Sequence, residues 1–281
     1  MLTEWLANLS IVMVGVVTFA VMLAAAAAGR FVRVAQVRRA GAGIQESGES
    51  VAQEGYLIGA VLGLLGLLLA FTFGMVLNRY EARRALATQE ANAIGTSYLR
   101  AQLLDEPHRS RLSNLLVVYT ENRIQLASDA HNARFVAVND RLLTEIWSAV
   151  AAARESAAAH GLSTAILMTY NEVIDLDTER KLAWSLRTPG EVLLLLLLYL
   201  MVTAAVVGHS VDGPRGRRSA LVLFALIALS ITVMADLNRP MSGRARESQQ
   251  AMRMLLMFLK AQPPAAFDTF RPQAAEVNDA R

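Results

Sequence analysis

Four long apolar stretches divide this chain, and polar segments rich in charged residues separate them. Each stretch holds about twenty residues, the length that an α-helix needs to cross a hydrocarbon core of about 30 Å. The third contains six consecutive leucines, and each leucine favours insertion by about 0.5 kcal/mol. The pattern therefore predicts four transmembrane helices, at Asn8–Gly29, Tyr56–Leu77, Val192–His209 and Ala220–Ala235.

The polar stretch between the second and third spans predicts an α-helical domain, since its roughly 110 residues suffice for a domain of its own. Asn78–Leu104 is rich in helix formers and is expected to continue span two out of the membrane. Further helices are predicted at Ala133–His160, ended by Gly161, and from Ser163 to Leu186. Residues Thr188, Pro189 and Glu191 resemble an N-cap, a first-turn proline and a capping-box acid for span three.

The predicted fold is an all-α membrane protein with four transmembrane helices and an α-helical hairpin domain inserted between spans two and three. Residues 1–77 hold spans one and two with a short polar loop, and residues 78–189 form the extramembrane domain. Residues 190–238 hold spans three and four. Residues 239–281 are expected to form an amphipathic helix, with the apolar stripe Met252, Leu255, Leu256 and Leu259, followed by a disordered tail.

Charge and composition exclude several classes of function. The formal net charge is +3, but the stretch 78–189 carries thirteen basic and thirteen acidic residues, so no nucleic-acid partner is expected. The chain contains no cysteine, which excludes disulfides, thiol catalysis and thiolate metal sites. The four histidines lie far apart in sequence, and no phosphate-binding or nucleophile motif is present. We expect no enzyme activity, no cofactor and no metal.

The distribution of arginine orients the predicted spans. The short loops after spans one and three carry four and three arginines, which places those loops in the cytoplasm, and the N-terminal tail carries none. With four spans, the domain 78–189 would then lie in the periplasm. Two groups of arginines argue against this orientation, namely Arg79, Arg83 and Arg84 directly after span two and Arg239, Arg244 and Arg246 directly after span four. Long domains, however, cross membranes largely regardless of charge, so the short loops carry more weight.

Span two carries small residues at regular spacing. Such a ridge lets two helix backbones approach closely in a bilayer. It serves either ordinary packing inside one bundle or a symmetric oligomer axis or pore. The residues of this glycine ridge are Gly59, Gly63, Gly66, Ala70 and Gly74.

Two polar clusters flank the spans. The first follows span two and is either an interfacial anchor or an electrostatic collar that concentrates anions at a pore mouth. It consists of Arg79, Glu81, Arg83, Arg84 and Glu90. The second lies at the end of span four, where Asp236 and Arg239 are spaced to pair on one helix face and Pro240 ends the helix.

Two segments resemble the bacterial bestrophin-like domain family. The first is Leu64–Ile124, with Ala-Phe-Thr-Phe from Ala70, Glu-Ala-Asn-Ala-Ile-Gly-Thr from Glu90, and Tyr-Leu-Arg from Tyr98. The second is similar to an Asp-x-Asp-Arg-Pro-x-x-Gly pattern, in which Asn238 replaces the usual acid and removes a charge. That motif comprises Asp236, Asn238, Arg239, Pro240 and Gly243.

The resemblance implies a multi-pass protein of the bacterial inner membrane, with a helical insertion between spans two and three. The family name suggests a relation to bestrophins, which are pentameric anion channels with span two around the pore. Bestrophin topology would place the domain 78–189 in the cytoplasm, opposite to the orientation from arginine counting.

Two functions remain open from the sequence. One is a homo-oligomeric ion channel, possible only as a closed ring because one protomer has no room for a pore. The other is a non-conducting membrane sensor or scaffold, whose helical domain binds a protein partner through an exposed face around Trp147 or Trp184. A transporter is disfavoured, because no inverted repeat or interrupted span is present.

Overall fold

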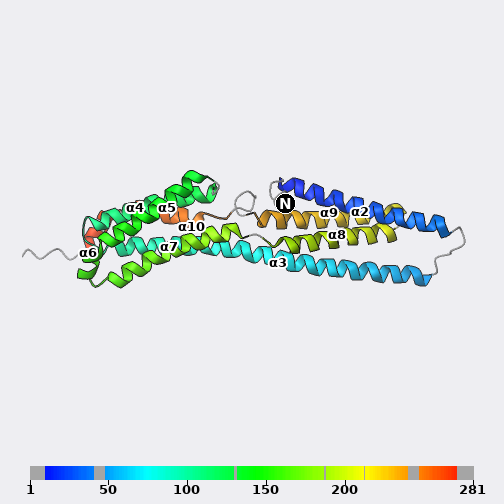
Figure 1. Cartoon of the computed structure of the whole chain (residues 1–281), viewed down its shortest axis with the longest axis horizontal. Helices are drawn as coiled ribbons and strands as arrows, with labels where there is room; N and C mark the ends of the chain where they lie inside the picture. Colours follow the sequence, from blue (N-terminus) through cyan, green and yellow to red (C-terminus); the bar gives the residue numbers. More distant parts are fainter. Residues whose placement is uncertain are drawn as a thin grey trace, which may run out of the picture. The chain divides into compact units, whose positions relative to one another are not determined.

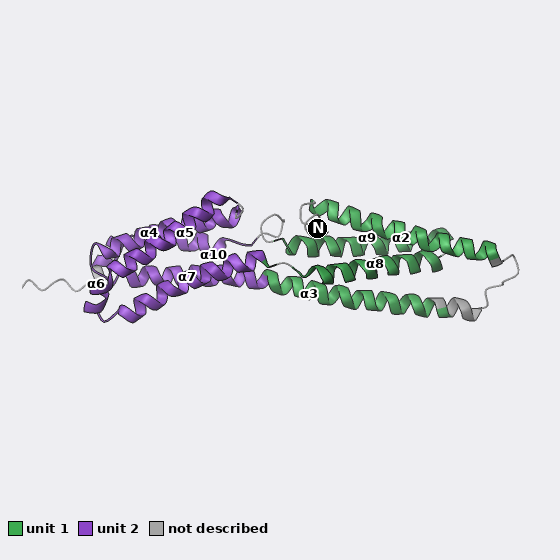
Figure 2. Ribbon diagram, viewed as in Figure 1, with its two compact units in different colours: residues 1–80, 186–246 green, residues 81–185, 247–281 purple. Residues whose placement is uncertain are grey.

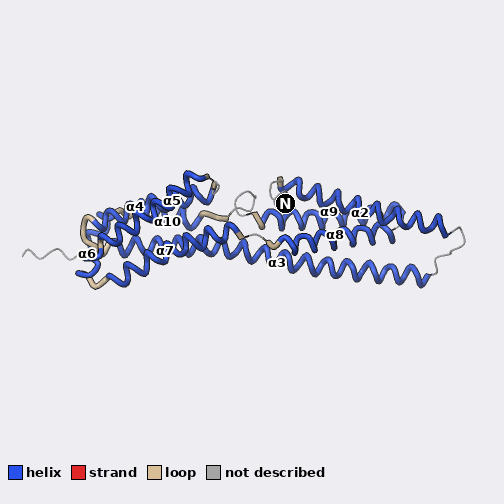
Figure 3. The backbone as a smooth tube through the Cα atoms, viewed as in Figure 1, coloured by secondary structure: helices blue, strands red, loops and turns tan. Residues whose placement is uncertain are grey.

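The computed structural model describes residues 10–40, 48–129, 132–186, 188–211, 213–239 and 247–270. Nearly all of these residues are helical, and no strand occurs among them (Figure 3). Four helices are long and apolar enough to cross a membrane. The predicted all-α class with four apolar helices is therefore confirmed. Pro240 and Gly243, predicted as part of the second family motif, and the predicted tail after residue 270 lie outside the described residues.

The described helices follow one another along the chain as Figure 1 labels them. The long apolar ones are α2 (Ile11–Ala40), α3 (Gly48–Ala101), α8 (Gly190–Ser210) and α9 (Gly213–Leu237). The others are α4 (His108–Ser128), α5 (Ala133–Ala152), α6 (Arg154–Ala159), α7 (Ser163–Ser185) and α10 (Gln250–Ala261), followed by the 3-10 helix η1 (Pro264–Phe270).

The chain divides into two compact units (Figure 2). Unit 1 comprises residues 1–80 and 186–246, and unit 2 comprises residues 81–185 and 247–281. Helix α3 contributes to both, as expected from the absence of a helix breaker after span two. Its 54 residues would extend about 80 Å, far more than the roughly 30 Å hydrocarbon thickness of a bilayer. The 24 residues of α3 that follow Leu77 therefore lie beyond the predicted span.

Two glycines allow α2 and α8 to pack closely in unit 1. A Cβ added at Gly29 would lie 2.0 Å from the carbonyl oxygen of Ala205, and one added at Gly208 would lie 2.0 Å from that of Ala26. Both distances are far below van der Waals contact, so only glycine fits at either position. The small residues that pack this bundle are therefore on α2 and α8, whereas the sequence pattern pointed to α3. The rest of the core of unit 1 includes Met22, Leu65, Leu196, Leu200 and Phe224.

Unit 2 has its own core, built from amphipathic helices. In α4 the residues Leu112, Leu116 and Tyr119 are fully buried and recur at helical spacing on one face. Helix α10 buries Met252 and Leu259 of its predicted stripe against the same core. The C-terminal helix thus completes the fold of unit 2.

Three local predictions can be compared with the structure. The helix predicted at Ala133–His160 is divided at Ala153 into α5 and α6. Gly161 adopts a φ of 68°, the left-handed conformation expected after a helix end. Helix α8 begins at Gly190, and Thr188 does not cap it; its side chain instead donates a hydrogen bond to Asn238 (2.9 Å).

The packing of α2 against α8 generates a testable prediction. Gly208→Ala should lower the stability of the protein by about 1–3 kcal/mol, because the added methyl group overlaps the α2 backbone. Gly55→Ala is the matched control, since no atom from another part of the described chain lies within 4 Å of its Cβ position and Gly55 lies outside the glycine ridge. The measurement is thermal unfolding in detergent, followed by circular dichroism. Equal melting temperatures for the two variants would contradict the close packing.

Candidate functional site

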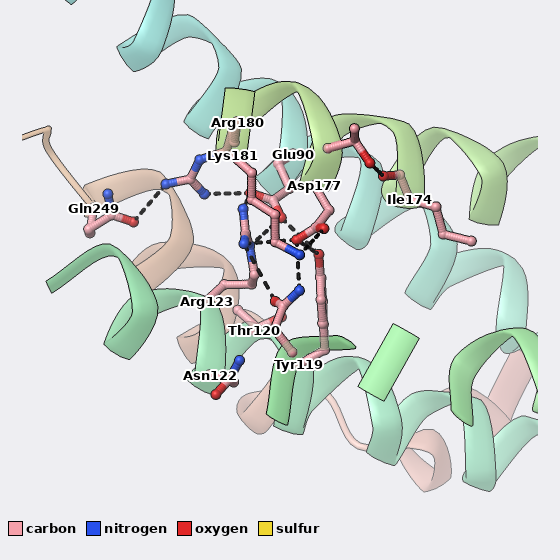
Figure 4. Close-up of polar contacts among 12 residues, drawn as sticks. Glu90, Tyr119, Thr120, Asn122, Arg123, Ile174, Asp177, Arg180, Lys181 and Gln249 are labelled. Atoms are coloured by element: carbon pink, nitrogen blue, oxygen red, sulfur yellow. Dashed lines mark hydrogen bonds and ion pairs between the residues drawn. The ribbon is translucent and has the colours of Figure 1, made fainter. Parts of the chain in front are cut away.

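A buried carboxylate lies at the centre of unit 2. Glu90 of α3 is fully buried and is bound by two arginines from two other helices (Figure 4). Arg123 of α4 reaches its two oxygens through Nε (2.6 Å) and Nη2 (3.1 Å). Arg180 of α7 binds Oε2 through Nη1. The hydroxyl of Tyr119 donates a hydrogen bond to Oε1 (3.0 Å). Glu90 thus holds α3, α4 and α7 together.

A second buried carboxylate extends this network. Asp177 of α7 is 2 % exposed and lies 2.8 Å from Arg123 Nη1 through its Oδ1. The same oxygen accepts a hydrogen bond from Asn139 Nδ2 of α5 (3.0 Å). Its Oδ2 lies 2.8 Å from Lys181 Nζ, which also reaches Asp140 Oδ1 at 2.8 Å. We call the residues Glu90, Tyr119, Arg123, Asn139, Asp177, Arg180 and Lys181 the ionic network.

Arg180 connects the ionic network to the segment before α10. Its Nη2 lies 2.8 Å from Oε1 of Glu247 and 3.4 Å from the side-chain oxygen of Gln249. The indole of Trp184 donates to the other oxygen of Glu247 (2.9 Å), and its ring centroid lies 5.1 Å from the Arg180 guanidinium carbon. Cation–π contact and ion pairing therefore hold the same arginine.

Opposite charges within the ionic network favour the ionised forms of Glu90 and Arg123. Burial alone raises the pKa of Glu90, but the attraction of Arg123 and Arg180 outweighs it, and the pKa lies below its ordinary value. Burial also raises the pKa of Tyr119, and the neighbouring Glu90 raises it further. For Arg123, burial opposes the charge, but the negative groups around it raise the pKa above its usual range.

These pKa directions limit what the ionic network can do chemically. General acid–base catalysis works best with a pKa near the working pH. Here the pKa of Glu90 is lowered and the pKa values of Tyr119 and Arg123 are raised, so none of these three groups exchanges a proton easily near neutral pH. No cluster of three or more potential metal ligands occurs within the described residues. The arrangement fits a structural clamp between helices.

The structure separates the residues predicted as a charged collar. Glu81 and Arg84 are exposed, as a collar requires. Arg83 is only 3 % exposed, and Glu90 is fully buried in the ionic network. The reason is helical spacing, because residues seven apart lie on one helix face and both of these face the interior of unit 2. Glu90 is therefore not part of an exposed collar, which corrects that prediction; Arg79 is half-buried.

The glycine ridge of α3 is open. Gly59, Gly63, Gly66 and Ala70 are exposed. No atom from another part of the described chain lies within 4 Å of a Cβ built at Gly59, Gly63, Gly66 or Gly74. An apolar groove of about 410 Å³ lies between α3 and α9, and its lining includes Ala70, Phe73, Leu229 and Val233. Within the described residues, the four glycines of the ridge are thus not used for close packing against another helix.

The second family motif closes the end of α9. The side-chain oxygen of Asn238 accepts hydrogen bonds from the hydroxyl (2.9 Å) and the backbone N–H (3.4 Å) of Thr188. The backbone N–H of Arg239 donates to the carbonyl of Asp236 (3.1 Å). A side-chain pair between Asp236 and Arg239 stays a prediction. Asn238 thus holds the residue that precedes Pro189 and α8. Because its side chain is an uncharged amide, this contact needs no residue of opposite charge.

Sequence reasoning missed most of the ionic network. A signal was nevertheless present, because Arg123 continues the buried stripe of Leu116 and Tyr119 in α4 at helical spacing. Arg180 continues the stripe of Val173 and Asp177 in α7 in the same way. A charged residue at an otherwise apolar position of a helix predicts a buried ion pair. Trp184, expected on an exposed face, is half-buried against Arg123 and Arg180 of the network, whereas Trp147 is 42 % exposed.

Removing one arginine should destabilise unit 2. Arg123→Met leaves Glu90 and Asp177 buried with one cation fewer, which should cost about 3–5 kcal/mol. The control is Arg141→Met, which removes an exposed pair with Glu145 and should cost less than about 1 kcal/mol. Hydrogen exchange of the amides in α4 and α7 measures the difference. If these amides were as well protected from exchange in Arg123→Met as in Arg141→Met, the role of the ionic network as a clamp would be refuted.

The lowered pKa of Glu90 predicts a dependence on pH. A folded-state pKa below the unfolded value, about 4.3, stabilises the protein fully above that value. The stabilisation is lost as the pH falls through the folded-state pKa. Wild-type protein should therefore melt at a higher temperature than Glu90→Gln at pH 7, and the gap should narrow progressively below about pH 4.3. A gap that stays constant down to pH 3 would show that the ionised carboxylate is not the stabilising form.

Comparison with known proteins gives one match. No curated protein and no solved structure matches the chain. The sequence model of the Bestrophin-like domain family matches residues 23–252. This range covers most of the chain, from the first apolar helix to the beginning of α10, and includes Glu90, Arg123, Arg180 and the glycine ridge. The chain belongs to the Bestrophin-like domain family.

Proposed function

We propose that this protein forms a closed homo-oligomeric ring in the bacterial inner membrane, and that the ring conducts ions along an axis surrounded by copies of α3. The open glycine ridge is the observation that carries this proposal. Membership of the Bestrophin-like domain family supports a channel-related role. Anions are the first class to test, because Arg84 lies exposed on α3 after the span.

The ridge supports an interface because of what a bilayer offers. Lipid tails are as apolar as leucine, so helices associate in lipid mainly through close packing at small residues. In unit 1 that packing is complete between α2 and α8, where Gly29 and Gly208 meet the opposite backbone. The four small positions Gly59, Gly63, Gly66 and Gly74 of α3 have no such contact within the described chain. A neighbouring copy would supply it.

A pore requires more than one copy. The interior of unit 1 is filled by large side chains, including Met22, Leu65 and Phe224, each at most 2 % exposed. A conducting path through one protomer would have to displace them. An axis shared by several copies needs no such change, and a closed ring uses the same contact at every interface.

The alternative is a non-conducting sensor or scaffold whose unit 2 binds a protein partner. Trp147 on α5, 42 % exposed, favours it, because an exposed tryptophan is typical of interaction surfaces. Oligomeric state and ion flux together separate the two proposals, since conduction requires a ring and a scaffold conducts no ion.

The interface generates a prediction at Gly63. Gly63→Leu should break the oligomer without unfolding the protomer, because leucine prevents close approach of a second helix, whereas no atom from another part of the described chain lies within 4 Å of a Cβ built at Gly63. Ala225→Leu is the matched control, since Ala225 is exposed on α9. Native mass in lipid nanodiscs measures the oligomer, and anion flux in liposomes measures conduction.

The outcomes are distinct. A ring of four or more copies that Gly63→Leu abolishes, with loss of flux, supports the proposal. If the wild-type protein is a monomer or dimer, no shared axis exists and the channel proposal is contradicted. A ring that is intact in Gly63→Leu contradicts the role of the ridge, and a ring without flux for any ion favours the scaffold.

A further inference from the structure

We propose that one end of unit 1 binds the phosphate groups of anionic membrane lipids. This end carries seven arginines from two helices, and we call it the arginine end. It consists of Arg30, Arg33, Arg38 and Arg39 of α2 and Arg215, Arg217 and Arg218 of α9.

Contacts between helices bring the two groups of arginines to the same end of unit 1. The side chain of Arg33 donates to the carbonyl oxygen of His209 near the end of α8 (3.1 Å), and His209 Nδ1 lies 3.3 Å from the carbonyl oxygen of Gly29. Helix α9 begins at Gly213, soon after His209. The first turns of α9 therefore lie near the level of Gly29 and Arg33, and α2 continues beyond them toward Ala40 (Figure 1).

The arginine end is strongly cationic. Six of its seven arginines are exposed, and Arg33 is half-buried. Helix α2 contains no acidic residue, and neither do residues 213–220 of α9. The flanking sequence at 41–54 and 212 holds four acidic residues against these seven arginines, so an excess of positive charge remains. Such a concentration of like charge attracts anions from its surroundings.

Apolar side chains between the arginines point to lipid as the source of the anion. Phe31 is 74 % exposed, Val34 40 % and Val37 60 %. Exposed apolar groups alternating with arginines fit the boundary between acyl chains and headgroups, where arginine side chains extend toward the phosphates. A site for dissolved phosphate would not need them. Clusters of four to eight basic residues beside a transmembrane helix are a known pattern for anionic lipid.

The ligand chemistry is a phosphodiester with a net negative charge. Phosphatidylglycerol carries this charge, whereas the choline group of phosphatidylcholine neutralises it. Because anionic lipid attracts such clusters electrostatically, we expect selective binding of the first lipid that weakens as the salt concentration rises. The proposal concerns each protomer and does not depend on ring formation or conduction.

The test is native mass spectrometry of the purified full-length chain in neutral detergent, titrated with phosphatidylglycerol or with phosphatidylcholine of the same acyl chains. Detergent solution has no inside or outside, so an effect of arginine on membrane orientation does not interfere. The variant replaces Arg215, Arg217 and Arg218 with Gln. The matched control replaces Arg111, Arg134 and Arg154 with Gln, three exposed arginines of unit 2. A parallel titration adds inorganic phosphate as competitor.

Wild type and control should bind phosphatidylglycerol more tightly than phosphatidylcholine. In the variant, the affinity for phosphatidylglycerol should fall about tenfold or more, whereas the affinity for phosphatidylcholine should not change. Equal binding of the two lipids by wild type would overturn the proposal. An equal loss in variant and control would also overturn it, because any arginine would then serve. Displacement of the lipid by millimolar inorganic phosphate would reassign the site to dissolved phosphate.

Discussion

The buried carboxylate of Glu90 is the constraint on which unit 2 depends. A lone carboxylate in a protein interior is strongly unfavourable, and two arginines from different helices make it tolerable here. The same arginines then require further carboxylates, which Asp177 and Glu247 supply. One buried charge thus determines the position of three helices and of the segment that leads into α10.

The two units solve different packing problems. In unit 1 the helices have no hydrophobic effect to hold them together in lipid, so Gly29 and Gly208 permit backbone contact. In unit 2 water drives the apolar faces together, and buried ion pairs determine which faces meet. Neither mode of packing uses the open ridge of α3 or the arginine end of α2 and α9.

Periodicity and span length were enough to predict the four apolar helices, the continuation of α3 beyond Leu77 and the buried stripe of α10. These features depend on local sequence and on the thickness of a bilayer. The ionic network depends on contacts between residues distant in sequence, such as Glu90 and Arg180, which no local pattern encodes. The ridge was visible in the sequence, but whether another helix of the chain covers it follows only from the packing.

Arg180 also has a consequence for how the protein can move. Its guanidinium binds Glu90 on α3, which includes span two, and Glu247, which follows span four along the chain. Arg180 itself lies on α7, the helix that precedes span three. The chain segments next to three spans therefore share one buried ion. If one of these segments separated from the others, it would leave a buried charge unmatched. A rearrangement of the segments around Arg180 is therefore expected to be a switch between two states instead of a gradual shift.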